Sequence, residues 1–369
     1  MTPRDEQELA EAIASAREPL RIIGGGTRPV GRTDAAATLT TADLEGITLY
    51  EPGALTVVAR AGTPLAEIEA TLAEEGQRLP FEPGDWRALL GTEGEPTIGG
   101  AVAANVSGPR RVQAGACRDS LIGVRFVDGT GTVVKNGGRV MKNVTGYDLV
   151  KLMAGSWGTL GVLTEVSFKV LPAPEASALL TVEVDDATAA VRALAAALTS
   201  PWDVTGAAYL PGTGAMVRIE GFAASIDYRT GKLAEHLAPH GAVTVERDHM
   251  NVAGAWRAVR DVAPFHGRAG DVWRISVKPS DAPAIAERLG GEQVFDWGGG
   301  LIWALLPEGT DARARIGRFS GHATLIRASD ETKARIAAFQ PEPAPLAKIA
   351  AGLRAKFDPK GILNPGLMG

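Results

Sequence analysis

Residues 97–108 read TIGGAVAANVSG, a segment with three glycines and hardly a side chain longer than valine. Such small residues let another molecule approach the backbone closely, and exposed backbone N–H groups can then hold an anion. The segment therefore predicts a cradle for a phosphate group. A tight packing corner is the alternative interpretation of the same small residues.

Two further glycine-rich segments flank this one. RIIGGGT occupies residues 21–27, and NVTGYDL occupies residues 143–149 and leads to Gly155, Gly158 and Gly161. Three such segments in one half of the chain favour one long ligand that carries a pyrophosphate. Because no G-x-G-x-x-G stands between a strand and a helix and no Walker loop occurs, a nicotinamide-binding Rossmann unit and a P-loop are not expected.

The composition excludes several classes of protein. The 38 Lys and Arg residues are outnumbered by 43 Asp and Glu residues, so the chain has no electrostatic footprint for nucleic acid. The one cysteine, Cys117, excludes an internal disulfide and a Cys-rich metal or iron–sulfur site, and it favours a reducing compartment. The polar, acidic first ten residues do not resemble a signal peptide, and no apolar run of about 18 residues occurs. A cytoplasmic location is therefore expected.

Residues 1–174 predict a unit of mixed helices and strands. Thr2 and Pro3 are expected to cap a first helix whose apolar face carries Leu9 and Ile13. A second helix is expected within residues 63–76, and strands are expected at residues 20–23, 37–40, 47–50, 55–60, 121–127, 132–135 and 161–170. Residues 121–135 should form a β-hairpin.

The motifs of residues 1–174 together resemble the FAD-binding domain of the vanillyl-alcohol oxidase type, also called the PCMH type. The matching motifs, in the family's order, are GGGT at residues 24–27, TIGGAVAANVSG, the pair Arg118-Asp119, KNVTGYDL from Lys142 and GSWGTLGVLTEVSFKVLP from Gly155. Within this type the chain most resembles the smaller flavin-binding subunits, the E subunits, of bacterial glycolate oxidases. The resemblance implies an α+β fold whose FAD-binding domain has two α+β subdomains.

The resemblance also implies FAD as the cofactor. The FAD is expected to be noncovalent, because Gly26 and Thr27 stand where relatives can carry a linking histidine, the first histidine is His236, and Cys117 is interpreted as a small packed residue. The cofactor-binding residues that the resemblance implies are Gly24, Gly25, Gly26, Thr27, Pro83, Gly84, Thr97, Gly99, Gly100, Asn105, Ser107, Gly108, Gly146, Asp148, Gly158, Gly161, Val162 and Asn364.

Residues 175–335 predict an α+β cap domain built from two β-α-β-β-α-β units, whose sheets we expect to join over the flavin. The first unit is expected to have strands at residues 179–184, 204–209, 216–220 and 242–246, with helices at 187–198 and 223–237. After a linking helix near residues 251–259, the second unit is expected to have strands at 272–277, 293–296, 301–305 and 323–327, with helices at 282–289 and 312–319.

Residues 336–369 are expected to return to the FAD domain. A helix from Pro345 should present Leu346, Ile349, Leu353 and Phe357 on one face. The ending DPKGILNPG resembles the D-P-x-x-I-L-N-P-G close of the family, which implies that the asparagine lies near the flavin.

The cap offers two weak candidates for catalysis. Flavin oxidation of a 2-hydroxy acid needs a cation for the carboxylate and a base for the hydroxyl proton, and Arg274 and His322 could serve. The alternatives are that Arg274 pairs with a cap carboxylate and that His322 has its hydrogen bonds satisfied at a strand start. Trp157 stands where relatives commonly have an acidic residue, and it would shield the cofactor, contact a partner or only pack.

No metal site is expected in this chain. Relatives that oxidise D-2-hydroxy acids usually carry the run H-x-G-D-G-N-x-H, and this sequence has none. Only His236 and His240 have a helical ligand spacing, and Pro239 between them favours a helix end.

The resemblance implies a subunit of a complex that oxidises glycolate to glyoxylate. The expected partners are a larger flavin subunit and an iron–sulfur subunit, with a small hydroxy acid as the substrate of the complex and a peripheral position at the inner membrane through these partners. The missing metal motif and Trp157 favour oxidation by the larger subunit, with this chain relaying electrons or supporting assembly. The alternatives are a self-sufficient FAD-dependent dehydrogenase that uses Arg274 and His322, and an assembly protein with an empty flavin site.

Overall fold

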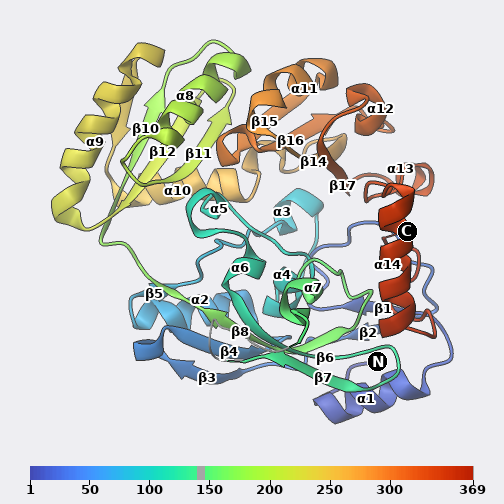
Figure 1. Cartoon of the computed structure of the whole chain (residues 1–369). Helices are drawn as coiled ribbons and strands as arrows, with labels where there is room; N and C mark the ends of the chain where they lie inside the picture. Colours follow the sequence, from blue (N-terminus) through green and yellow to red (C-terminus); the bar gives the residue numbers. More distant parts are fainter. Residues whose placement is uncertain (139–145, 369) are drawn as a thin grey trace.

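The computed structural model describes residues 1–138 and 146–368, and its strands form two main sheets (Figure 1). The lower sheet has five strands in the order β3-β4-β8-β6-β7, and each neighbouring pair is antiparallel. Its strands are β3 (Ile47–Glu51), β4 (Thr56–Arg60), β8 (Val162–Lys169), β6 (Leu121–Val127) and β7 (Val133–Gly137). The predicted hairpin of residues 121–135 is confirmed by the pairing of β6 with β7.

Apolar side chains hold two sets of elements against this sheet. Ile68 of α2 (Leu65–Glu74) and Val102 of α4 (Ile98–Ala103) share one core cluster with Phe126 and Phe168 of the sheet. A second cluster joins α1 (Glu6–Ser15) to the parallel pair β1 (Leu20–Ile23) and β2 (Ala37–Thr40). The N-terminal half therefore combines helices and strands, as the sequence predicted, while its division into two α+β subdomains stays a prediction.

The start of α1 differs from the prediction. Asp5, not Thr2, is the N-cap, and its carboxylate accepts a hydrogen bond from the Glu8 N–H at 2.8 Å. Aspartate is among the best capping residues, and here it lies directly before the first helical turn, whereas Thr2 lies too far upstream to reach it. Leu9 and Ile13 are buried, as the apolar periodicity predicted.

The upper sheet has eight strands in the order β13-β10-β12-β11-β15-β16-β14-β17, and it confirms the two β-α-β-β-α-β units. The first unit is β10 (Ala176–Val182), α8 (Ala187–Thr199), β11 (Val204–Leu210), β12 (Gly214–Gly221), α9 (Ala223–Leu237) and β13 (Val243–Glu246). The second is β14 (Asp271–Val277), α11 (Ala282–Leu289), β15 (Glu292–Asp296), β16 (Leu301–Leu306), α12 (Ala312–Ile316) and β17 (Gly321–Arg327).

The two units join at their equivalent strands β11 and β15, where Tyr209 pairs with Phe295. The strand order in one half of the sheet is therefore the reverse of the order in the other. One boundary prediction is wrong, because α12 ends at Ile316 and not at residue 319. Gly317 follows it with a φ of 71°, a backbone conformation that ends a helix and that glycine adopts without strain.

Helices cover the two faces of the upper sheet unequally. Figure 1 shows α8, α11 and α12 toward the top of the molecule and α9 along the left side of the upper sheet. The apolar side chains of these helices form one core with the sheet. The linking helix α10 (His249–Arg260) lies on the opposite face, where Trp256 packs with Met216 of the sheet. This second face also packs against the N-terminal half, because Trp86 and Leu89 share a cluster with Trp303 and Leu305.

A cluster of charged side chains, which we name the seam cluster, joins loops and β5 of the N-terminal half to β12 of the upper sheet. It consists of Arg78, Glu82, Arg110, Arg218 and Glu220. Arg218 donates to both oxygens of Glu82 at 3.0 and 2.9 Å, and Arg110 donates to both oxygens of Glu220 at 3.0 and 2.5 Å. Burial would raise the pKa of Glu220, but Arg218 and Arg110 outweigh it and hold that pKa far below its usual range.

The C-terminal segment ends against β1. The Leu20 N–H donates to Ile362 O at 2.7 Å, and the Asn364 N–H donates to Leu20 O at 3.0 Å. Before it stand α13 (Asp330–Arg335) and α14 (Ala344–Phe357). The division into residues 1–174, 175–335 and 336–369 stays a prediction.

The remaining elements are short. They are β5 (Gln77–Arg78), α3 (Arg87–Leu90), α5 (Arg111–Ala114), α6 (Cys117–Ser120), α7 (Leu149–Met153), β9 (Leu171–Pro172) and the 3-10 turns η1 (Pro52–Ala54), η2 (Ala238–His240), η3 (Ala263–Phe265), η4 (Pro279–Asp281) and η5 (Trp297–Gly299). Across residues 1–138 and 146–368, no helix combines the length and the apolar character that a membrane crossing needs.

Candidate functional site

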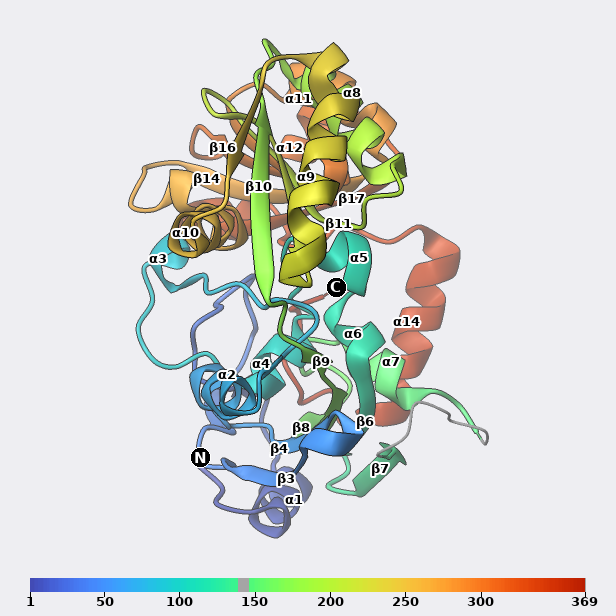
Figure 2. The ribbon, with the colours of Figure 1, turned by 90° about the vertical axis from the view of Figure 1, so that its left-hand side faces the viewer.

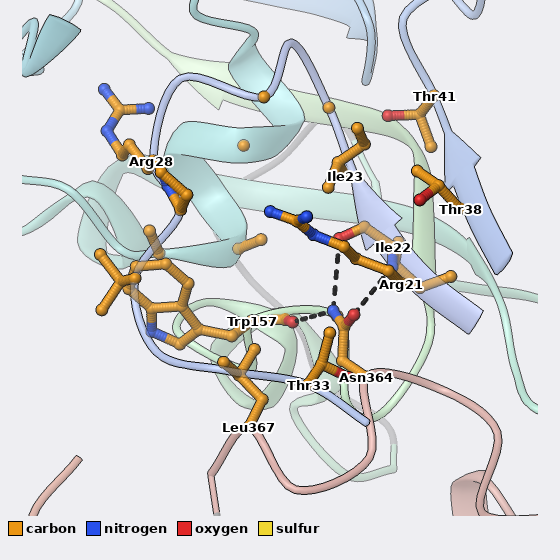
Figure 3. A pocket seen from close by; sticks show the side chains of 18 of the residues that line it. Arg21, Ile22, Ile23, Arg28, Thr33, Thr38, Thr41, Trp157, Asn364 and Leu367 are labelled. Atoms are coloured by element: carbon orange, nitrogen blue, oxygen red, sulfur yellow. Dashed lines mark hydrogen bonds between the residues drawn. The ribbon is translucent and has the colours of Figure 1, made fainter. Parts of the chain in front are cut away.

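A cavity of about 520 Å³ lies beside β1 and the loop that follows it (Figure 3). Its volume is within the roughly 300–1,000 Å³ of typical ligand pockets. The sequence-predicted residues that line it are Gly24, Gly25, Gly26, Thr27, Thr97, Gly99, Gly100, Gly158, Gly161, Val162 and Asn364. Residues from both ends of the chain and from its middle therefore meet at one cavity, which we name the flavin cavity.

The loop of Gly24 to Thr27 presents unused backbone donors. Among the described residues, no acceptor is found for the N–H groups of these four residues. The glycines fit the loop into its place, because a Cβ on Gly25 would lie 1.8 Å from the carbonyl oxygen of Glu95. Gly26 has a φ of 71°. Free N–H groups in a row suit an anion such as a pyrophosphate.

The segment of residues 97–108 is organised differently, and here the expectation of exposed N–H groups is wrong. Thr97 caps the short helix α4, and the Gly100 N–H donates to the Thr97 hydroxyl at 3.2 Å. The Gly99 N–H donates to the Ala61 carbonyl at 2.8 Å. A Cβ on Gly99 would lie 2.7 Å from Ala61, so the small residues permit tight packing, which was the alternative interpretation.

The wall of the flavin cavity carries cations that the sequence prediction missed. Lining residues include Arg21, Arg28, Arg32 and Lys333, against one carboxylate, Asp330. Figure 3 shows the Arg21 side chain extending across the cavity from β1, and Arg21 forms no ion pair with the described residues. Its position three residues before Gly24 of the GGGT loop was the signal that sequence analysis could have used. This excess of positive charge suits a pyrophosphate.

Arg28 follows the loop directly and is held in the wall. Its Nη2 donates to the carbonyl oxygen of Gly84 at 2.6 Å, and its guanidinium lies 5.4 Å from the centre of the Trp86 ring. Burial lowers the pKa of Arg28 to about 10, so the side chain stays protonated at neutral pH. Its buried Nε has no partner among the described residues.

Asn364 connects two parts of the cavity wall (Figure 3). Its Oδ1 accepts the Ile22 N–H at 2.7 Å, while its Nδ2 donates to Ile22 O at 3.3 Å and to Trp157 O at 2.8 Å. Both amide hydrogens are therefore used within the chain. Asn364 positions β1 against the loop that carries Trp157, in addition to lining the cavity.

Trp157 both lines the flavin cavity and packs against the C-terminal segment. Its ring lies edge-on to Phe339 with 5.3 Å between the ring centres. Its φ of 53° is unusual for a bulky side chain, which indicates local strain. The N–H and C=O groups of Trp157 are held by Ala103 and Asn364, and these two bonds maintain that conformation.

Several predicted cofactor residues lie elsewhere. Pro83, Gly84, Asn105, Ser107, Gly108, Gly146 and Asp148 are not among the residues that line this cavity. The Ser107 hydroxyl accepts the Cys117 N–H at 3.0 Å, and the Asp148 carboxylate caps α7 by accepting the Lys151 N–H at 3.1 Å. Residues 142–145 of the KNVTGYDL motif lie outside the described residues.

The two catalytic candidates also lie apart from the flavin cavity, on the face of the upper sheet that meets the N-terminal half. The Arg274 guanidinium lies 5.0 Å from the centre of the Trp297 ring, and Arg111 lies 4.5 Å from the same ring. Burial, Arg274 and Arg111 lower the pKa of His322. In the described part of the chain Arg274 forms no direct ion pair, although burial and Arg111 lower its pKa while the nearby cap carboxylate of Asp296 raises it. The alternative of a cap carboxylate partner therefore stays open.

Trp297 joins this basic group to the N-terminal half, because its Nε1–H donates to Gly108 O at 3.0 Å. Sequence reasoning missed the roles of Arg111 and Trp297. The neighbouring carboxyl of Asp296 is buried, and burial raises its pKa to about 7.

The residues present fit an FAD. The donors at the flavin cavity are backbone N–H groups and guanidinium groups, and the buried Ser156 hydroxyl in its wall has no partner among the described residues. Cys117 is buried outside the lining, and burial raises the pKa of its thiol. For residues 1–138 and 146–368, no group of three or more His, Cys, Asp or Glu side chains is placed to share a metal ion.

Known proteins resemble this chain in sequence and in fold. The family model described as an FAD binding domain matches residues 1–137. Glycolate oxidase subunit GlcE of Escherichia coli (strain K12) is 39% identical over 369 residues, which is 98% of this chain and 95% of that protein. Glycolate oxidase subunit GlcD of Bacillus subtilis (strain 168) is 27% identical over 58% of this chain and 44% of its own length.

A solved structure of alkyldihydroxyacetonephosphate synthase has a TM-score of 0.71 at 16% identity and covers 99% of this chain and 76% of that chain. This likeness confirms the predicted fold class.

Proposed function

Because the chain belongs to the family of glycolate oxidase E subunits, we propose that it is the FAD-binding subunit of a complex that oxidises glycolate to glyoxylate. The observation that carries the proposal is the 39% identity to GlcE along nearly the whole chain, together with a cavity whose donors suit a pyrophosphate. The chain is thus an FAD-dependent oxidoreductase subunit.

The residues of the flavin cavity have separate tasks. The N–H groups of Gly24 to Thr27 and the guanidinium of Arg21 bind the pyrophosphate, because these donors of the wall have no partner among the described residues. Asn364 and Trp157 form the wall and keep β1 in place. When bound, FAD accepts two electrons and releases them singly, which suits a junction between a two-electron donor and one-electron carriers.

The FAD is bound noncovalently. Cys117, the one thiol, lies outside the residues that line the flavin cavity, and no histidine precedes His236 in the sequence. The dissociation of FAD is therefore reversible, and acid precipitation releases it.

The partners are a larger flavin subunit and an iron–sulfur subunit. GlcD, which also matches this chain, is itself named a glycolate oxidase subunit, and we take a GlcD-like protein as the larger flavin subunit. One cysteine in 369 residues cannot supply the thiolates of an iron–sulfur cluster, so the cluster belongs to another chain. The complex lies in the cytoplasm, and these partners attach it to the inner membrane.

A second candidate function is favoured by one observation. Arg274 and His322 lie on one face of the upper sheet, and Arg111 of α5 lies against the same Trp297 ring as Arg274. Arg274 forms no direct ion pair among the described residues. Such a group could bind the carboxylate of a hydroxy acid, which would make this chain a self-sufficient dehydrogenase. The third candidate, an assembly protein with an empty flavin site, conflicts with the unpaired donors of the Gly24–Thr27 loop.

Anaerobic absorbance spectra test these candidates. We expect the purified chain to be yellow, to release FAD on acid precipitation, and to keep its oxidised spectrum when glycolate is added. Adding the larger subunit and glycolate should then bleach the flavin of this chain. Bleaching by glycolate alone, abolished in Arg274→Gln, would instead establish the self-sufficient dehydrogenase. A colourless chain that takes up no FAD would overturn both.

A further inference from the structure

A second cavity, of about 420 Å³, lies between α7, α14 and the start of β17. We name it the α14 groove. Its lining is mainly apolar and includes Leu152, Leu160, Phe339, Leu353 and Met368. Of the catalytic and flavin-binding candidates, His322 alone is among the lining residues, and one imidazole does not account for an apolar groove at this position.

The helix beside the groove exposes part of its apolar face. Leu346, Ile349, Leu353 and Phe357 are spaced by three or four residues and therefore lie on one stripe. The sequence predicts one apolar face, and of this face only Leu353 and Phe357 contact the core of the N-terminal half. Leu346 and Ile349 are 54% and 61% exposed.

The position of α14 explains why Leu346 and Ile349 are exposed. Figure 2 shows α14 along the outer side of the molecule, where only its C-terminal end approaches the lower sheet. Among the residues of α14 none is fully buried. An apolar stripe that is covered at one end and continues uncovered at the other is an incomplete packing interface.

The charge of α14 has one sign. The helix carries Lys348, Arg354 and Lys356 and no acidic residue. Two copies of this helix would therefore repel each other if they packed together. A complementary partner has apolar side chains with acidic residues beside them.

The α14 groove also adjoins the flavin cavity. Ser156 lines both cavities, so one residue of the Gly155–Leu160 loop separates them. A protein segment in the groove would therefore lie close to the wall of the FAD site. A subunit that exchanges electrons with this flavin has reason to dock here.

We propose that the α14 groove and the exposed half of α14 dock an apolar, acidic-flanked helix of the larger flavin subunit. This inference rests on the proposed function, because it takes its partner from the complex. The exposed Leu346 and Ile349 extend the stripe that Leu353 begins, and Lys348 contacts the acidic flank. The docked helix completes the packing that α14 lacks within this chain.

Binding of the larger flavin subunit from the same organism to the full-length chain tests the proposal. The double variant Leu346→Asp/Ile349→Asp changes two exposed residues, so the chain should keep its FAD content. A matched control is Phe222→Asp/Met250→Asp, which alters two apolar residues of the cap that are each 72% exposed. The dissociation constant is measured by sedimentation velocity, together with the FAD to protein ratio of each variant.

We expect the α14 double variant to bind the larger subunit at least tenfold more weakly and the cap control to bind normally. Lys348→Glu should also weaken binding and should reduce its dependence on salt. Binding of the α14 variant within twofold of the unaltered chain would overturn the inference while leaving the proposed function intact. A homodimer of this chain that the α14 variant disrupts would assign the groove to a second copy and overturn it as well.

Failure of the unaltered chain to bind the larger subunit would refute the inference and the partner assignment together. Lack of FAD in the unaltered chain would refute the proposed function separately. These outcomes are distinguished because FAD content and subunit binding are measured on the same samples.

Discussion

The wall of the flavin cavity and the seam cluster are both rich in arginine, yet they use their polar groups in opposite ways. In the seam cluster, the carboxylates of Glu82 and Glu220 receive two or more hydrogen bonds from arginines of the same chain. At the flavin cavity, Arg21 has no carboxylate partner among the described residues, and the N–H groups of the GGGT loop have no acceptor. Charged groups that are all paired within the chain indicate a structural role, and hydrogen-bond donors without a partner indicate a ligand site.

The comparison also explains why two glycine-rich segments that look alike in sequence differ in role. The N–H groups of the Gly24–Thr27 loop have no acceptor in residues 1–138 and 146–368, whereas the N–H groups of Gly99 and Gly100 donate to Ala61 and Thr97. A high glycine content shows only that some other group lies close to the backbone of the segment. Whether the neighbour is a ligand or the chain itself depends on where the hydrogen bonds go.

The largest effect is expected from Glu220→Gln, which removes the ion-pair partner of Arg78 and leaves Arg110 and Arg218 to share Glu82. Removing one member of a buried ion pair typically costs about 3–5 kcal/mol of the free energy of unfolding. Urea unfolding of the FAD-free chain measures the loss. The control Glu235→Gln removes the exposed pair with Lys232 and should leave the unfolding free energy unchanged. Equal effects of the two variants would refute the structural role of the seam cluster.

Arg21→Ala tests the other side of the comparison. A hydrogen bond to a charged group contributes about 1.5–3 kcal/mol, so FAD should bind roughly 10- to 150-fold more weakly. The unfolding free energy of the FAD-free chain should not change, because Arg21 has no ion-pair partner there. Fluorescence titration with FAD measures the affinity, with Arg17→Ala as the exposed control. Unaltered FAD affinity in Arg21→Ala would contradict the assignment.

The pH dependence should also separate the two regions. The pKa values of Glu82 and Glu220 are lowered in the folded chain, because arginines outweigh the effect of burial. Their contribution is therefore present above the unfolded pKa of about 4.3 and is lost as the pH falls toward the folded pKa, by about 1.4 kcal/mol per unit of lowering. Acid unfolding curves should show this loss, and Glu220→Gln should flatten it. A curve of equal slope in the variant would exclude Glu220 as its source.

The smallest effect is expected from Thr97→Ala, which removes the cap of α4. Loss of an N-cap costs about 1 kcal/mol of stability. Because the N–H groups of this segment are used within the chain, FAD affinity should fall much less in Thr97→Ala than in Arg21→Ala. The opposite ranking, measured in the same titrations, would return residues 97–108 to the role of a phosphate cradle.

Periodicity was sufficient to predict most of the fold. The bounds of α9 and α11 agree with the sequence prediction because each helix has a clear apolar face and a glycine or proline near its end. Sequence could not place Leu346 and Ile349, because the period of α14 identifies its apolar face but not how far the neighbouring core extends. The first helix was wrongly capped because two capping signals, Thr2 and Asp5, compete within three residues.

The site was predicted in part. Glycine positions and the resemblance located residues that line the flavin cavity, but the prediction missed Arg21 and Arg28, because an arginine in a strand or loop is usually a surface charge. Hydrogen-bond partners distant in sequence, such as Asn364 with Ile22 and Trp157, cannot be derived from spacing. Such long-range contacts decide which polar groups remain free for a ligand.

Titration of the FAD-free chain with FAD tests the central claim most directly. We expect saturation at one FAD per chain, release of that FAD by acid, and a higher melting temperature in its presence. A folded chain that binds no FAD, or that keeps the flavin after acid precipitation, would contradict the noncovalent site assigned to the GGGT loop and Arg21.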